Sequence, residues 1–338
     1  MKRLVMALTV IFGLAGAGIA RRRPKLANVA PELRSPVLYV PMSVTGDRSL
    51  TIGRKLMSTP QPGAMVAGVD RRTEVVPASG EQPAVPVVIY DRPGRTGPSG
   101  ALLWIHGGGL VMGTPAAGDG LCSRFAAELD LVVVSVDYRL APEHPFPAGL
   151  HDCLAALEWL HSNAENLGVD PARVVVGGDS AGGGLAACLA QLAHDRGGPA
   201  ICFQLLQYPM LDDRTALRAD AEALTWTNTS NRYAWSAYLG HPVRADEPRP
   251  YASAARRADL GGLPPAWIGI GTIDLFHAES IEYATRLEAA GVPCDVHVVP
   301  GMYHAAERMV PKAPSMIALL DAMTTALRAA VAPTEPAR

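Results

Sequence analysis

Residues 177–184 read GGDSAGGG and surround the single hydroxyl of Ser180 with residues that are nearly all very small. The valine-rich run at 173–176 before them predicts a buried strand, and the alanine- and leucine-rich run at 185–192 after them predicts a packed helix. Ser180 is therefore expected at a strand-to-helix junction. The pattern Gly-x-Ser-x-Gly at 178–182 is typical of a tight turn that strains the serine backbone and exposes its hydroxyl.

The composition is that of a folded globular protein, because 18% of the 338 residues are charged and 49% are hydrophobic. The formal net charge is −2 and the basic residues are scattered apart from Arg21–Arg23, which argues against a nucleic-acid partner. No CxxC pair occurs among the five cysteines, so we expect core thiols, no metal site and no other cofactor. The cysteines are Cys122, Cys153, Cys188, Cys202 and Cys294.

Strand-like and helix-like stretches alternate from residue 73 onward, which indicates an α/β fold with an eight-stranded, mostly parallel sheet flanked by helices. The first two strands have no helix between them and are expected to pair in antiparallel fashion. The predicted strands are Thr73–Val76, Val85–Tyr90, Ala101–Ile105, Leu131–Val136, Arg173–Gly177, Phe203–Tyr208, Ala266–Gly271 and Asp295–Val299. The predicted helices lie around Leu121–Leu129, Leu150–Asn163, Ala181–Asp195, Ala278–Ala290 and Ser315–Ala330.

Two stretches depart from this alternation. Residues 26–72 are mixed and proline-rich, and an insertion at about 211–251 separates two of the predicted strands. Stretches of this length inside a compact domain are usually functional lids. The predicted organisation is therefore an N-terminal segment at 26–72 and an α/β domain at 73–338 that carries the insertion.

The N-terminus predicts contact with a membrane or export across it. Lys2 and Arg3 precede the uncharged run Leu4–Ala20, and Arg21–Arg23 follow it directly. This pattern is that of a secretory signal, and its length is also the lower limit for a membrane-spanning helix. We expect residues 1–25 to act as an uncleaved anchor, with a buried helix of a cytoplasmic protein as the alternative.

A glycine run lies directly after the predicted strand Ala101–Ile105, where residues 106–109 read HGGG. When a serine attacks an ester carbonyl, the oxygen becomes an anion that aligned backbone N–H groups can stabilise. Glycine allows the backbone to approach that oxygen closely. An ordinary glycine-rich turn is the alternative, and the nearby serine turn favours the catalytic interpretation.

A serine hydroxyl needs a base to remove its proton, and the base is usually a histidine that a carboxylate orients. After turns of this kind the chain order is serine, acid, histidine. His304 lies in a loop after the last predicted strand, at the sheet edge where open α/β sheets bind ligands, and Asp274 lies in a loop at the same edge. His277 is the rival base. The remaining candidates after Ser180 fall in helices, strands, the insertion or the opposite edge. They are His194, His241, His297, Asp259 and Asp295.

Four motifs occur in the order and spacing of one known family: HGGG at 106–109, DYRLAPEHPFPA at 137–148, GDSAGG at 178–183 and GTIDLF at 271–276. Over residues 73–330 the chain resembles the hormone-sensitive-lipase-like esterases of the α/β-hydrolase fold. The resemblance implies a catalytic triad of Ser180, Asp274 and His304. It also implies a helical cap made of the N-terminal segment and the insertion, and an oxyanion hole from the N–H groups of Gly108, Gly109 and Ala181.

The expected activity is hydrolysis of short- to medium-chain carboxylic esters, small-molecule substrates, through an acyl-enzyme. An amidase, lactonase or drug-ester hydrolase with the same triad is the alternative, as is a non-catalytic ligand-binding member of the fold. Leu110, Trp226 and Trp235 are candidate substrate-binding residues, although the two tryptophans are equally consistent with the core of the cap. Leu110 and Ala305 replace residues common in the family, phenylalanine and glycine. Residues 137–148 are expected to brace the structure, and the oligomeric state is not predicted.

Overall fold

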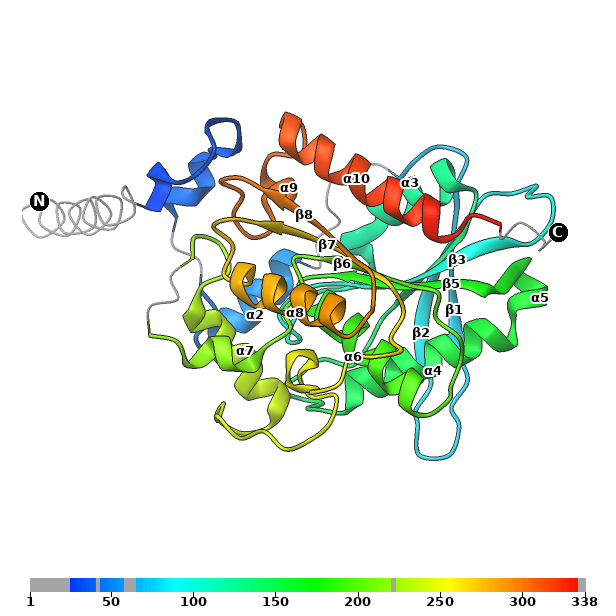
Figure 1. Cartoon of the computed structure of the whole chain (residues 1–338), viewed down its shortest axis with the longest axis horizontal. Coiled ribbons are helices and arrows are strands. Elements are labelled where there is room, and N and C mark those ends of the chain that lie inside the picture. Colours follow the sequence, from blue (N-terminus) through cyan, green and yellow to red (C-terminus); the bar gives the residue numbers. More distant parts are fainter. Residues whose placement is uncertain (1–24, 41–42, 58–64, 220–222, 334–338) are drawn as a thin grey trace, which may run out of the picture.

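A single sheet of eight strands organises the chain (Figure 1), and the computed structural model describes residues 25–40, 43–57, 65–219 and 223–333. The strand order is β1-β2-β4-β3-β5-β6-β7-β8. The β1–β2 and β2–β4 pairs are antiparallel, and the other pairs are parallel. The strands are β1 Asp70–Val76, β2 Val85–Asp91, β3 Ser99–Ile105, β4 Val132–Val136, β5 Val169–Asp179, β6 Phe203–Gln207, β7 Ala266–Gly271 and β8 Cys294–Val299.

The mostly parallel sheet and its antiparallel start are confirmed. Parallel strands are covered on both faces and read as continuous apolar runs, and β4 is buried at every position. The main difference is β5, which begins at Val169 and not at Arg173. Gly168 adopts a left-handed conformation with φ 60°, its carbonyl accepts from Ser99 N–H at 3.0 Å, and the chain thereby enters the sheet early.

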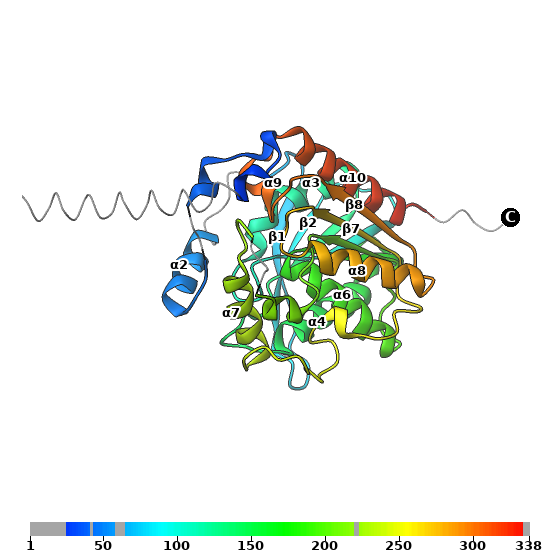
Figure 2. The same ribbon diagram turned by 60° about the vertical axis from the view of Figure 1, so that its left-hand side comes forward.

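Helices cover both faces of the sheet, with α3 and α10 on one face and α4, α6 and α8 on the other (Figures 1 and 2). Each of these five matches a predicted helix to within about two residues, which is the usual uncertainty of helix ends. The helices are α2 Asp47–Met57, α3 Asp119–Leu129, α4 Ala148–Ser162, α5 Ala164–Leu167, α6 Ala181–Asp195, α7 Asn228–Leu239, α8 His277–Ala289, α9 Ala306–Met309 and α10 Pro314–Ala330.

The N-terminal segment and the insertion contact each other through α2 and α7. Val44 N–H donates to Ser230 Oγ at 2.9 Å, and Tyr233 Oη lies 3.3 Å from Asp47 Oδ1. Arg54 of α2 joins these two segments to the loop after β3, since its Nε donates to the Val111 carbonyl at 2.8 Å. The two irregular stretches therefore lie together, although they are far apart in the sequence.

The predicted N-terminal anchor and the five cysteines lie apart from the sheet edge and the cap contacts described above. The predicted N-terminal anchor lies outside the described residues except for Lys25, and within the described ranges no helix combines the length and the apolar character needed to cross a membrane. All five cysteines are free thiols, and four of them are buried, as expected for core residues.

The turn at Ser180 is strained and tightly packed. Ser180 has φ 56° and ψ −118°, a conformation that non-glycine residues rarely adopt. Gly182 packs against the end of β3, where a Cβ added to it would lie 1.9 Å from the carbonyl oxygen of Ile105. A Cβ on Gly178 would lie 2.4 Å from the same oxygen. The glycines are needed because two backbone segments touch, and not because of their own dihedral angles.

We predict that Gly182→Val lowers the melting temperature by several degrees or abolishes soluble expression, because overpacking against an immobile backbone costs about 1–3 kcal/mol or more. The control is Gly46→Val, since a Cβ on Gly46 would meet no atom of the described residues within 4 Å. Thermal unfolding of both variants checks the prediction. An unchanged melting temperature in Gly182→Val would show that the turn is misplaced.

Candidate active site

Ser180, His304 and Asp274 form a continuous chain of hydrogen bonds. The Nε2 atom of His304 lies 2.8 Å from Ser180 Oγ, and its Nδ1 atom lies 2.8 Å from Asp274 Oδ2. All three residues are buried. Asp274 Oδ1 accepts from Phe276 N–H at 2.9 Å, so the carboxylate is fixed at both oxygens. A serine, an imidazole and a carboxylate in this order can make the hydroxyl oxygen nucleophilic.

The three side chains meet because their loops leave the sheet at the same edge. Ser180 follows β5, Asp274 follows β7 and His304 follows β8, and these strands run parallel. The chain order and the strand ends predicted these residues at this edge, and the structure brings them together there. The rival His277 begins α8, and its Nδ1 atom has no hydrogen-bond partner among the described residues.

The imidazole of His304 is held on several sides. The edges of Tyr208 and Phe276 pack against it, with ring centroids 4.7 Å and 5.1 Å away. Thr225 of the insertion donates to the His304 carbonyl at 2.6 Å. Ala305 has a left-handed backbone with φ 57°, which explains why glycine suits this position. The cost of having alanine here is therefore backbone strain.

The loop after β3 passes beside Ser180. A Cβ on Gly108, which has φ 124°, would lie 2.0 Å from the Met112 carbonyl oxygen, so the loop closes on itself. Gly109, with φ 63°, supports the ring of Trp226. Ala181 is the first residue of α6, where a helix leaves its N–H groups without intrahelical partners. Such N–H groups can bind a developing oxyanion.

Residues 137–148 brace this loop, in agreement with the structural role expected from the sequence. Tyr138 Oη donates to the His106 carbonyl at 2.9 Å, and the two rings stack with centroids 4.4 Å apart. Burial lowers the pKa of His106 to about 4, so this imidazole is neutral near neutral pH. Arg139 forms an ion pair with the buried Asp152 at 2.8 Å, which ties the start of the segment to helix α4 that follows it.

Asp179, the residue before the serine, has a role that was not predicted from its sequence motif. Its Oδ1 accepts from Gly107 N–H at 2.9 Å, and its Oδ2 accepts from Arg308 at 2.8 Å. Asp179 therefore ties the loop after β3, the turn at Ser180 and helix α9 after His304 together. The motif offered a signal, since an aspartate in a turn of small residues must find its partner elsewhere. Arg308 offered none, because 129 residues separate it from Asp179.

The predicted substrate-binding residues have different places. Leu110 is buried, with φ 67°, and lies directly after the glycine run. Trp226 packs over Gly109 and is partly exposed. Trp235 is 2% exposed within α7, and its ring packs edge-on against Tyr238. Trp226 thus adjoins the loop beside Ser180, whereas Trp235 packs within the layer formed by the insertion.

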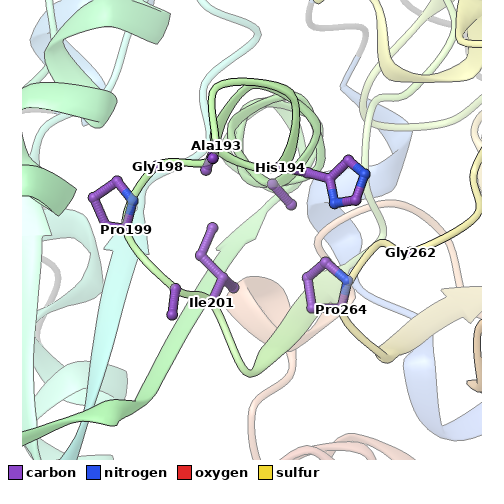
Figure 3. A pocket seen from close by; sticks show the side chains of 10 residues that line it. Ala193, His194, Gly198, Pro199, Ile201, Gly262 and Pro264 are labelled. Carbon is purple, nitrogen blue, oxygen red and sulfur yellow. The ribbon is translucent and has the colours of Figure 1, made fainter.

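A separate hollow of about 340 Å³ lies at the other end of α6 (Figure 3). His194 forms part of its wall, about 20 Å along the helix from Ser180 at 1.5 Å per residue. Its other lining residues are small or aliphatic, so it offers no nucleophile beside a base. Within the described ranges, no group of three or more histidine, cysteine, aspartate or glutamate side chains could hold a metal ion.

We predict that Asp179→Asn lowers kcat about tenfold with little change in KM, because the loop after β3 and the His304 loop lose a shared ionic anchor. Asp91→Asn is the matched control. It weakens the Arg95–Asp91 pair, which is 2.6 Å long and lies at the other edge of the sheet. Steady-state ester hydrolysis by both variants checks this. Equal kcat in Asp179→Asn and wild type would contradict the positioning role.

Known proteins share this architecture. A family model described as alpha/beta hydrolase fold matches residues 102–308. Esterase LipI of Mycobacterium tuberculosis is 43% identical over 208 residues, which cover 60% of this chain and 64% of LipI. Ethyl acetate hydrolase of Pseudomonas putida is 36% identical over 232 residues, covering 67% of this chain and 72% of that protein. A solved bacterial heroin esterase has a TM-score of 0.84 and 34% identity, covering 91% of this chain and 100% of that chain.

The region that matches the family extends from β3 into α9 and includes the glycine run, Ser180, Asp274 and His304. The fold expected from the sequence is therefore confirmed. The chain belongs to the hormone-sensitive-lipase-like family of carboxylic ester hydrolases with the α/β-hydrolase fold.

Proposed function

We propose that the chain hydrolyses short- to medium-chain carboxylic esters through an acyl-enzyme formed on Ser180. The observation that carries the proposal is the buried chain of hydrogen bonds from Ser180 through His304 to Asp274, with both histidine contacts at 2.8 Å. In the first step Ser180 Oγ attacks the ester carbonyl carbon, and its proton passes to His304 Nε2. Asp274 accepts the hydrogen bond from Nδ1–H and stabilises the resulting imidazolium.

The remaining steps use the same groups in turn. The bond between the carbonyl carbon and the alkoxy oxygen breaks, and His304 gives its proton to the departing alcohol. A water molecule then attacks the acyl-enzyme while His304 takes its proton, and the acid leaves as Ser180 regains a proton. The N–H groups of Gly108, Gly109 and Ala181 serve as the oxyanion hole, where one donor contributes about 3 kcal/mol to transition-state stabilisation.

The proposed acyl length rests on what covers the site. The cap is the pair of segments that meet through α2 and α7, and Arg54 and Thr225 fasten it to the loops beside Ser180. Trp226 occupies the space above Gly109. A cover fixed this closely favours small acyl groups, and one relative carries the name ethyl acetate hydrolase. Leu110 and Trp226 are proposed to line the acyl pocket, and Trp235 to support them from within the cap.

We predict that the full-length chain hydrolyses p-nitrophenyl esters with an optimum at a short or medium acyl length, and that Ser180→Ala lowers kcat/KM by at least about 10⁴-fold. The control is Ser135→Ala, because Ser135 is buried in β4 and its hydroxyl has no partner among the described residues. Stopped or continuous absorbance assays of all three proteins measure this. The ester proposal would be wrong if the folded wild type hydrolysed amides or lactones but no esters. Loss of that activity in Ser180→Ala would then show that the same serine acts on the other substrate class.

We further propose that residues 4–20 attach the enzyme to a membrane, on the basis of their uncharged sequence. Two arginines in this run, as in the double variant Leu8→Arg with Ile11→Arg, should release the chain to the soluble fraction. Each charge opposes membrane insertion by about 2.5–3.5 kcal/mol. Fractionation followed by a high-salt wash checks the prediction, with esterase activity as the control for folding. A wild-type chain found entirely in the soluble fraction would overturn it.

A further inference from the structure

A second cavity lies close to the triad but is not part of it. Its volume is about 210 Å³, and it lies between α3, the sheet and α10. Asp179, Glu307 and Arg308 line it, whereas Ser180, Asp274 and His304 do not. Met316, Leu319 and Met323 of α10 supply an apolar wall. One side of the cavity is therefore apolar, and the other carries the charged side chains of Asp179, Glu307 and Arg308.

Two polar atoms at this cavity have no hydrogen-bond partner among the described residues. One is the indole Nε1 of Trp104, whose side chain is almost wholly buried at 1% exposure. The nitrogen faces Gly118, another lining residue, where an added Cβ would lie 3.4 Å from it. The other is Glu307 Oε2. Leaving a buried donor or acceptor unsatisfied is destabilising, so both atoms favour a polar partner that enters the cavity.

The charges at the cavity exclude most ligand classes. Arg308 pairs with Asp179 at 2.8 Å and lies 3.7 Å from Glu307 Oε1. Arg124, the other basic residue that lines the cavity, pairs with Glu128 at 2.6 Å and with Asp321 at 3.0 Å. An anionic ligand would face the carboxylates of Asp179 and Glu307, and a cationic ligand would face the two arginines. A neutral ligand meets neither repulsion. It must offer an acceptor for the indole N–H and a donor for the free oxygen of Glu307.

We propose that this cavity is a binding site for a small uncharged alcohol. A hydroxyl can accept a hydrogen bond from Trp104 Nε1–H and donate one to Glu307 Oε2, directly or through a bridging water. Its alkyl chain lies along Met316, Leu319 and Met323. A cavity of about 150 Å³ holds benzene, so this larger one accommodates an alkyl chain of about four to six carbons. Leu121 of α3 and Leu320 of α10 also line the cavity and are partly exposed.

The experiment measures binding and does not depend on ester hydrolysis. The full-length chain carrying Ser180→Ala and ¹⁵N-labelled tryptophan is titrated with 1-pentanol, and the indole N–H signals are recorded by NMR. The Trp104 signal is assigned by its loss in Trp104→Phe. We expect this signal to shift and to saturate while the other indole signals stay in place. Pentanoate at the same concentrations should leave it unmoved.

A matched pair of substitutions on α10 tests the location. Leu320→Phe narrows the cavity and should weaken 1-pentanol binding at least tenfold, whereas Ile317→Phe should bind as the parent does, because Ile317 is 47% exposed and outside the cavity. Should Leu320→Phe fail to fold, Gly118→Ala places a methyl group against Trp104 Nε1 and should weaken binding as well. An unmoved Trp104 signal, equal binding of pentanoate, or unchanged affinity in the folded cavity variants would overturn the proposal.

Discussion

The contact between the backbone of Gly182 and the carbonyl group of Ile105 is the constraint on which the site depends. No side chain fits between them, since a Cβ on Gly182 would overlap that oxygen at 1.9 Å. The contact sets the start of α6 against the end of β3. As a result the turn at Ser180 lies against the start of the loop after β3, where a Cβ on Gly182 would also lie 2.6 Å from the His106 carbonyl oxygen. Ser180 adopts a strained backbone in this turn.

Two buried carboxylates, those of Asp179 and Asp274, also hold the site together. Asp179 joins the loop after β3 to Arg308, and Asp274 fixes the imidazole of His304. Such bonds are strong where water is scarce, and the same scarcity makes an unpaired group costly. Two carboxylates with distinct partners therefore keep the nucleophile, the base and the candidate oxyanion donors in register. The proposed alcohol site adjoins one of these pairs, which places any bound molecule next to the anchor of the glycine loop.

Much of the fold could be predicted because its signals are local. The run Val132–Val136 has four valines and one serine and is buried at every position, and a strand covered on both faces suits it. Ser180, Asp274 and His304 could be nominated because each follows a predicted strand in the required chain order. The early start of β5 could not be predicted, since it depends on the left-handed Gly168 and on pairing with Ser99. The left-handed backbone of Ala305 could not be predicted from the alanine itself, since alanine rarely adopts that conformation, and only the glycine common in the family points to it.

The sequence by itself determined the alternation of strands and helices and the tight serine turn. It also determined the edge of the sheet where Ser180, Asp274 and His304 lie. It did so because side-chain periodicity and glycine spacing act within a few residues. Only the tertiary structure decided that Arg308 reaches Asp179, that Trp226 rather than Trp235 lies over Gly109, and that Trp104 and Glu307 leave polar atoms at one cavity. These contacts join distant segments whose loop paths no local pattern specifies.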